Sequence, residues 1–256
     1  MIHPDPTART TEQEEIFRRF MDCREDFINA QLGRSGFAKH ELTAQWEIVP
    51  EPIKKALPNT RQGFGLSGGF GVGKTFALVA LLRRITGVEV DRHMAALLQE
   101  ENWFDLDGIT KARRLPLAVA NLWCNWPGEV SERRAQLFQK QHGDVEDWIQ
   151  GLQEPSRLVI LDDLGADRVA GQDWAGEVLA RVIDERLRRQ GLTIWTSNLD
   201  AKGLIERYGP RTFSRLQSLA PMILLPKLPD LRLHPPQRPH NGHLGLLDSA
   251  ISNPKN

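Results

Sequence analysis

Short apolar runs alternate along this chain with stretches of helical periodicity, and the alternation predicts an α/β fold with a parallel sheet. Runs that predict strands occupy residues 64–67, 115–120, 158–161, 192–198 and 222–225, and the first of them is only weakly apolar. Apolar residues at helical spacing occupy residues 76–82 and 173–190, and two short helices are expected between 121 and 152. A long charged passage, residues 87–114, follows the first of these helices. Helices between strands provide the crossover connections that parallel strands require.

The N-terminal part of the chain contains an amphipathic helix of its own. Apolar residues recur at helical spacing from Ile16 to Leu32, behind a run of acidic residues that favours a first helical turn. This apolar face either packs on the chain's own core or docks on a partner. Prolines between residues 50 and 58 then indicate a linker. We therefore expect an N-terminal helical partner-docking extension and linker at 1–58, a core at 59–226, and a mobile tail rich in proline and histidine at 227–256.

A glycine-rich loop separates the first predicted strand from the helix that follows it. Its sequence fits the phosphate-loop pattern G-x-x-x-x-G-K-[ST] at each fixed position. Glycines let successive backbone N–H groups face one anion, and the start of the next helix adds partial positive charge there. Lys74 is placed to reach the β- and γ-phosphates, and the Thr75 hydroxyl is placed to bind Mg²⁺. The predicted cofactors are ATP and Mg²⁺, and the residues predicted to bind the nucleotide are Gly68, Gly69, Phe70, Gly71, Val72, Gly73, Lys74, Thr75 and Phe76.

Two adjacent carboxylates, Asp162 and Asp163, follow the apolar run at 158–161. Because α/β folds bind ligands at the carboxyl ends of parallel strands, Asp162 is expected beside Thr75. Asp162 would then hold Mg²⁺, directly or through water, so that Thr75 and Asp162 are the predicted metal ligands. Asp163 is the predicted general base, which polarises the attacking water.

Polar residues also close the next predicted strand and follow it in the chain. Asn198 ends the strand, and its amide can hydrogen-bond a γ-phosphate or a water, or else cap a loop. Further along, Arg211 and Arg215 are both suited to stabilise charge on a transferring phosphoryl group. A neighbouring subunit can supply such an arginine. These positions predict nucleotide hydrolysis.

Composition narrows the classes of function. Lys plus Arg and Asp plus Glu both count 33, which argues against a polybasic nucleic-acid-binding surface but permits a local basic patch. Arg133, Arg134 and Lys140 lie among tryptophans, a pattern that suits single-stranded nucleic acid, although tryptophans also suit a core. The two cysteines have no metal-type spacing, and neither a signal peptide nor a membrane span is found. A cytoplasmic protein without a membrane partner is expected.

Taken together, the motifs resemble the DnaC/IstB-like branch of the AAA+ ATPases, which contains replicative helicase loaders and transposition helpers. The resemblance rests on residues 68–75, 158–165, 194–199 and 214–216, and it covers about residues 60–226. It implies a P-loop NTPase (AAA+) fold, in which helices sandwich a parallel sheet. It also implies an N-terminal helical extension and no C-terminal lid domain.

The resemblance assigns a role to each motif. Lys74 and Thr75 correspond to Walker A, Asp162 and Asp163 to Walker B, Asn198 to sensor 1, and Arg215 to the arginine finger that acts on a neighbour's ATP. Asp163, Asn198 and Arg215 are thus the expected catalytic residues. The resemblance also places Arg133, Arg134 and Lys140 in a segment that touches single-stranded DNA. The N-terminal helix would dock on a helicase, and the protein would form an ATP-dependent homo-oligomer.

More than one function remains open on the sequence. The first is a replicative helicase loader whose binding of single-stranded DNA and of a hexameric helicase is gated by ATP. The second is a transposition helper ATPase that recruits a transposase, and the third is a nucleotide-dependent binding switch with little turnover. A kinase would need an acceptor pocket and a lid. The two carboxylates at 162–163, Asn198 and the arginines near residue 215 argue against a kinase.

Overall fold

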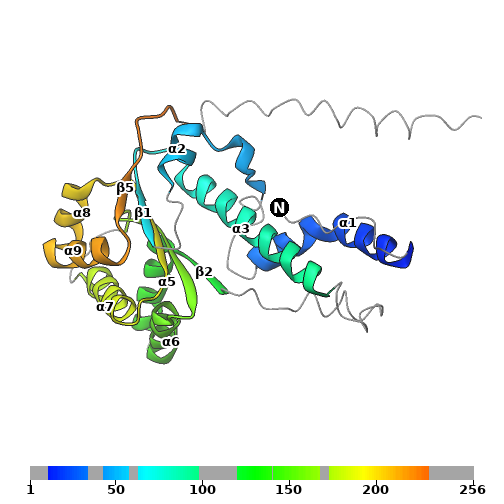
Figure 1. Cartoon of the computed structure of the whole chain (residues 1–256). Helices are drawn as coiled ribbons and strands as arrows, with labels where there is room; N and C mark the ends of the chain where they lie inside the picture. The colour runs from blue at the N-terminus through cyan, green and yellow to red at the C-terminus, as the bar shows by residue number, and fades with distance from the viewer. Residues whose placement is uncertain are drawn as a thin grey trace, which may run out of the picture.

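The computed structural model (Figure 1) describes residues 11–33, 43–57, 63–97, 120–139, 141–167 and 173–230. Parallel strands form a five-stranded sheet in the order β2-β3-β4-β1-β5. Their bounds are Phe64–Ser67 for β1, Ala120–Asn125 for β2, Arg157–Leu164 for β3, Thr193–Ser197 for β4 and Met222–Leu224 for β5. With a phosphate loop between β1 and the next helix, this is the predicted α/β P-loop NTPase fold.

Helices cover both faces of the sheet (Figure 1). The first layer consists of α1 (Thr11–Gly33), the short 3₁₀ helix η3 (Trp46–Ile48), α2 (Glu51–Ala56) and α3 (Lys74–Leu97). The second layer consists of α5 (Trp126–Phe138), α6 (His142–Gln153), α7 (Trp174–Arg188), α8 (Ala201–Tyr208) and α9 (Pro210–Leu219).

Strand β3 shows why both layers are needed. Leu158 and Ile160 belong to the apolar cluster under α1 and α3, whereas Val159 and Leu161 belong to the cluster under α5 to α9. Successive side chains of a strand point to opposite faces, so a continuous apolar run requires cover on both sides. The carboxyl end of β3 thereby lies between the two layers, with Asp162 buried at it.

A glycine in β1 makes room for a tryptophan of β4. Gly65 pairs with Trp195 of β4, and a Cβ at Gly65 would lie 1.9 Å from the indole ring. Trp195 is fully buried and donates from its ring nitrogen to the carbonyl of Ala220 at 2.9 Å. The weakly apolar composition of β1 therefore reflects close packing beside a tryptophan.

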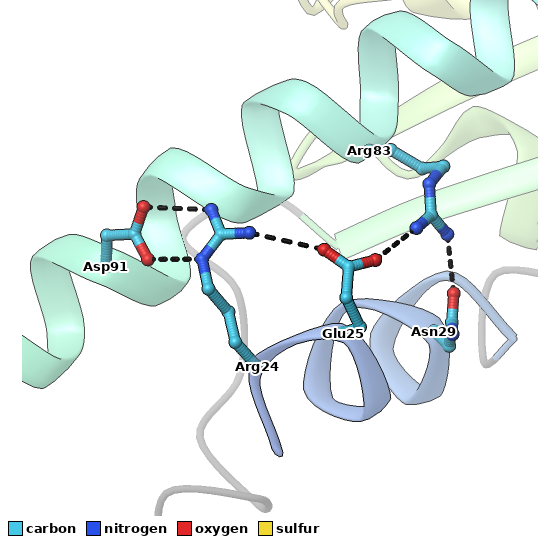
Figure 2. A network of polar contacts seen from close by, with 5 residues as sticks. All are labelled: Arg24, Glu25, Asn29, Arg83 and Asp91. Atoms are coloured by element: carbon cyan, nitrogen blue, oxygen red, sulfur yellow. Dashed lines mark hydrogen bonds and ion pairs between the residues drawn. The ribbon is translucent and has the colours of Figure 1, made fainter. Parts of the chain in front are cut away.

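Helix α1 packs along α3 through a polar network, which Figure 2 shows, and through an apolar face. Arg24 binds both carboxylate oxygens of Asp91, at 2.7 and 2.9 Å, and Glu25 bridges Arg24 and Arg83. Below this network Phe27, Ile28 and Leu32 are buried. The C-terminal half of α1 thus serves the chain's own core.

Helix α3 is longer than the sequence pattern predicts. A charged passage was expected from residue 87, but the helix continues through Gly87 to Leu97. A Cβ at Gly87 would lie 2.7 Å from a guanidinium nitrogen of Arg24. The glycine therefore allows α1 to approach α3 closely and does not end the helix.

Strand β2 differs from its predicted position. Residues 121–125, expected to begin a helix, form the strand with Ala120 and pair in parallel with β3. The helix begins only at Trp126, where the Asn125 side chain accepts from the N–H of Gly128 and Pro127 occupies the first turn. Of the predicted strand at 115–120, residues 115–119 lie outside the described residues.

The expected boundary near residue 58 does not coincide with a break in packing. Ala44, Val49 and Ile53 belong to the same apolar cluster as Leu66 and Leu78 of the core. Within the part of the chain that the structure describes, no helix is long and apolar enough to cross a membrane. The tail from residue 231 onward lies outside the described residues.

Candidate nucleotide site

The phosphate loop connects β1 to α3, and its conformation depends on glycine. Gly71 and Gly73 have φ angles of 67° and 88°, in the left-handed region that other residues rarely adopt. Val72 is buried beneath the loop, and Phe70 is exposed at its tip. Lys74, the first residue of α3, is 6% exposed and donates to the carbonyls of Gly68 and Gly69, both at 2.9 Å. The lysine ammonium is therefore held over the loop.

Asn198 links this lysine to one of the two carboxylates. Its side-chain oxygen accepts from the Lys74 ammonium at 2.7 Å, and its amide nitrogen donates to Asp163 at 3.1 Å. Ammonium groups only donate and carboxylates only accept, so these two partners fix the orientation of the amide. The ends of β1, β3 and β4 thus meet at one point, as the sequence predicts.

Asp162 forms a second connection between the same strands. The Thr75 hydroxyl lies 3.1 and 3.2 Å from the two oxygens of Asp162, and the hydroxyl of Thr196 donates to Asp162 at 2.6 Å. Thr196 in turn accepts from the backbone N–H of Asp163 at 2.9 Å. A carboxylate beside a threonine hydroxyl is an oxygen donor set that suits Mg²⁺. Thr75 and Asp162 therefore fit the role of metal ligands that the sequence predicts for them.

Arg215 lies outside this cluster in the subunit. It is on α9, where its guanidinium pairs with Asp184 of α7, and its side chain is 34% exposed. Arg211, one turn earlier on α9, is exposed. Neither arginine contacts Lys74 or Asp163 in the described residues, so a role in hydrolysis requires a second subunit.

The predicted DNA-binding residues have different surroundings. Arg133 of α5 pairs with Glu129 at 3.2 Å, donates to Gln136 and lies 5.8 Å from the ring centre of Trp148. Its guanidinium thus helps to pack α5 on α6. Arg134 is partly exposed, and Lys140 lies outside the described residues. Contact of these residues with DNA stays a prediction.

Sequence reasoning missed several residues near the site. Thr196 received no role, although it joins Asp162 to the backbone of Asp163. Asp230 was assigned to the tail, yet its carboxylate touches the phosphate loop, because a Cβ at Gly71 would lie 1.9 Å from Oδ1 of Asp230. A buried cluster of Asp167, Arg207 and Tyr208 lies behind Asp163. Of these, only Thr196 lies in a segment that the sequence already marked, the polar end of β4.

No model of a protein family matches the sequence, and no curated protein matches it. Solved structures of DNA-replication proteins do resemble this structure. A DnaC helicase loader has 17% sequence identity and a TM-score of 0.48, with 74% of this chain and 100% of that chain covered. A DnaI structure has 20% identity and the same TM-score, with 76% and 94% covered. The replication initiator DnaA bound to AMPPCP and single-stranded DNA has 15% identity and a TM-score of 0.46, with 83% and 60% covered.

The TM-scores are low, so the P-loop NTPase assignment is drawn from the strand order and from the geometry of the loop. That geometry also decides which chemistry the site supports.

Proposed function

We propose that this protein is an Mg²⁺-dependent ATPase that acts on DNA as a replicative helicase loader, with ATP gating its binding of single-stranded DNA and of a hexameric helicase. The observation that carries the ATPase part is the chain of contacts from Lys74 through Asn198 to Asp163. It brings a phosphate-binding cation, an amide and a carboxylate to one point beside the phosphate loop. The loader part is supported by the resemblance of the motifs to DnaC-like proteins.

The residues divide the work of hydrolysis. Lys74 and the loop N–H groups bind and orient the phosphates, and Asn198 holds Asp163 next to them. Thr75 and Asp162 would hold Mg²⁺, which when bound neutralises charge on the phosphate oxygens. Asp163 accepts a proton from, or orients, the attacking water. Arg215 would act on the ATP of a neighbouring subunit, because within its own subunit it is paired with Asp184 on α7.

Mixing two inactive variants tests the proposal. Lys74→Ala should weaken ATP binding at least about 100-fold, while the matched variant Lys54→Ala on α2 leaves binding unchanged. Arg215→Ala should bind ATP but not hydrolyse it. A mixture of the two variants should recover hydrolysis, since Lys74→Ala subunits supply the arginine and Arg215→Ala subunits supply the ATP site.

A further variant separates the arginine finger from the packing of α9. Asp184→Asn breaks the same ion pair as Arg215→Ala but keeps the arginine, so hydrolysis should persist. A wild-type rate per subunit that does not depend on protein concentration would contradict a finger supplied by a neighbour. Co-purification from the native cell tests the loader part: a hexameric helicase supports it, and a transposase would point to the transposition alternative.

A further inference from the structure

The backbone at Asp163 is strained. Its φ angle is 59°, in the left-handed region, and the pairing of β3 with β4 shifts register between Leu161 and Leu164. A turn follows, in which the N–H of Ala166 donates to the carbonyl of Asp163 at 3.1 Å. Gly165, inside this turn, has a φ of 89°. Residues with a side chain are uncommon in this conformation, although aspartate tolerates it better than most, and contacts with the surroundings stabilise it.

Tyr208 of α8 fixes the turn from outside. The backbone N–H of Gly165 donates to the tyrosine oxygen at 2.8 Å, and the hydroxyl donates to the carboxylate of Asp167. Tyr208 and Asp167 are both buried, at 8% and 6% exposed. Burial, followed by the charge of Asp167, raises the pKa of Tyr208 well above its ordinary value. The hydroxyl therefore stays protonated and keeps donating to Asp167.

Arg207 fastens the same cluster to the start of α7. Its guanidinium pairs with Asp167, and it also contacts both oxygens of Asp173 at 2.9 and 3.0 Å. Asp173 caps α7 by accepting from the N–H of Gly176 at 3.1 Å. The side chain of Arg207 is only 8% exposed. Arg207 thus ties both ends of the segment between β3 and α7 to α8.

We propose that Tyr208, Asp167 and Arg207 are positioning residues that hold Asp163 in the strained conformation in which Asn198 binds its carboxylate. This inference rests on the proposed ATPase function. The hydrogen bonds described above link the cluster to the turn at Gly165 and to the start of α7, and not to the phosphate loop. It therefore governs the rate of hydrolysis and leaves the affinity for ATP unchanged.

Tyr208→Phe is the sharpest test, because it removes a single hydroxyl from a buried ring. We expect kcat to fall about tenfold or more, with the Kd for ATP within about twofold of wild type. The matched control is Thr193→Val, which removes a buried hydroxyl at the opposite end of the sheet, where it contacts Arg186 and Gly191. This control should leave kcat unchanged even if it lowers thermal stability.

A double-mutant cycle distinguishes positioning from a general loss of structure. In an Asp163→Asn background, Tyr208→Phe should lower single-turnover hydrolysis no further, because both changes act through the same carboxylate. If the two effects multiply instead, the cluster does not act through Asp163 and the inference is wrong. Should Tyr208→Phe fail to fold, Asp167→Asn carries the same test, since it alters the acceptor of the same hydroxyl.

The outcomes also separate this inference from the proposed function. A wild-type protein that binds but never hydrolyses ATP would overturn the proposed ATPase. Wild-type hydrolysis combined with an unchanged kcat in Tyr208→Phe would overturn only the positioning role. A parallel loss of ATP affinity and kcat in Tyr208→Phe would likewise overturn it, because the cluster would then support the whole site.

Discussion

Buried cations lie at both ends of the parallel sheet, and their partners differ in kind. At the amino end, Arg186 of α7 is fully buried and donates to the carbonyls of Leu152, Glu154, Arg157 and Leu192, and to the hydroxyl of Thr193. At the carboxyl end, Lys74 donates to two loop carbonyls and to Asn198, which also binds Asp163.

The partners determine what each end can do. Around Arg186 the acceptors are mostly backbone carbonyls at the start of β3 and β4 and the end of α6, which have no chemistry of their own. Burial lowers the pKa of Arg186 to about 10, so the guanidinium stays charged at neutral pH and its hydrogen bonds persist. Gly191 permits this approach, since a Cβ there would lie 2.9 Å from the guanidinium. At the amino end, Arg186 therefore has a structural role, because it ties α7 to α6, β3 and β4.

At the carboxyl end the groups are polar side chains, two of them carboxylates, that contact one another. Asp162 and Asp163 of β3 are joined by side-chain hydrogen bonds to Thr75 of α3 and to Asn198 after β4, respectively. The backbone at Asp163 is strained, as often occurs at functional sites. A buried charge alone thus says little about function. The two ends differ because only the carboxyl end links its cation, through Asn198, to a carboxylate.

The largest expected effect tests the amino end. Arg186→Met should lower the free energy of unfolding by about 3–5 kcal/mol, because it removes the five hydrogen bonds that the buried guanidinium donates. The measurement is urea unfolding at low temperature, with Arg189→Met as the control, since Arg189 is the exposed C-cap residue of the same helix. ATP affinity of the folded variant should equal that of wild type. A selective loss of ATP binding without destabilisation would refute the division between the two ends.

A smaller effect is expected from Asp230 at the carboxyl end. Its carboxylate lies against Gly71, so it adds negative charge where the loop is predicted to bind phosphates. Asp230→Asn should therefore raise the affinity for ATP about three- to tenfold, or about 1 kcal/mol. Titration with a fluorescent ATP analogue measures this, and Asp144→Asn, an exposed change on α6, provides the control. Weaker binding in Asp230→Asn would mean that the carboxylate recognises the nucleotide and does not repel it.

The sequence was sufficient for the parts of the site that local patterns encode. The phosphate loop, Asp162, Asp163 and Asn198 lie at the ends of segments with clear strand patterns, and parallel pairing brings such ends together. The position of β2 was predicted wrongly, because the apolar run at 115–120 is a stronger strand pattern than Ala120–Asn125. Pairing with β3 makes residues 120–125 the strand. Gly87 was taken as the start of a new segment because its partner, Arg24, is distant in sequence.

No local sequence pattern indicates the cluster of Asp167, Arg207 and Tyr208. Asp167 and Tyr208 are far apart in the chain, and each is an unremarkable residue of a loop or a helix in isolation. Only the packing of α8 against the end of β3 places them behind Asp163. Positioning residues of this kind depend on tertiary contacts, whereas residues that bind phosphate are recognised by their spacing.

The smallest expected effect tests whether the site is independent of the far part of α3. Arg24→Ala removes the pairing with Asp91 shown in Figure 2, and it should cost only about 0.5–1 kcal/mol of stability because the pair is partly exposed. Arg181→Ala, which removes the exposed pair with Glu146 on the other layer, is the matched control. ATP affinity should stay within about twofold in both variants. A clear change of ATP affinity in Arg24→Ala alone would mean that α1 influences Lys74 through α3, which begins at that lysine. The N-terminal helix would then have to be counted as part of the nucleotide site.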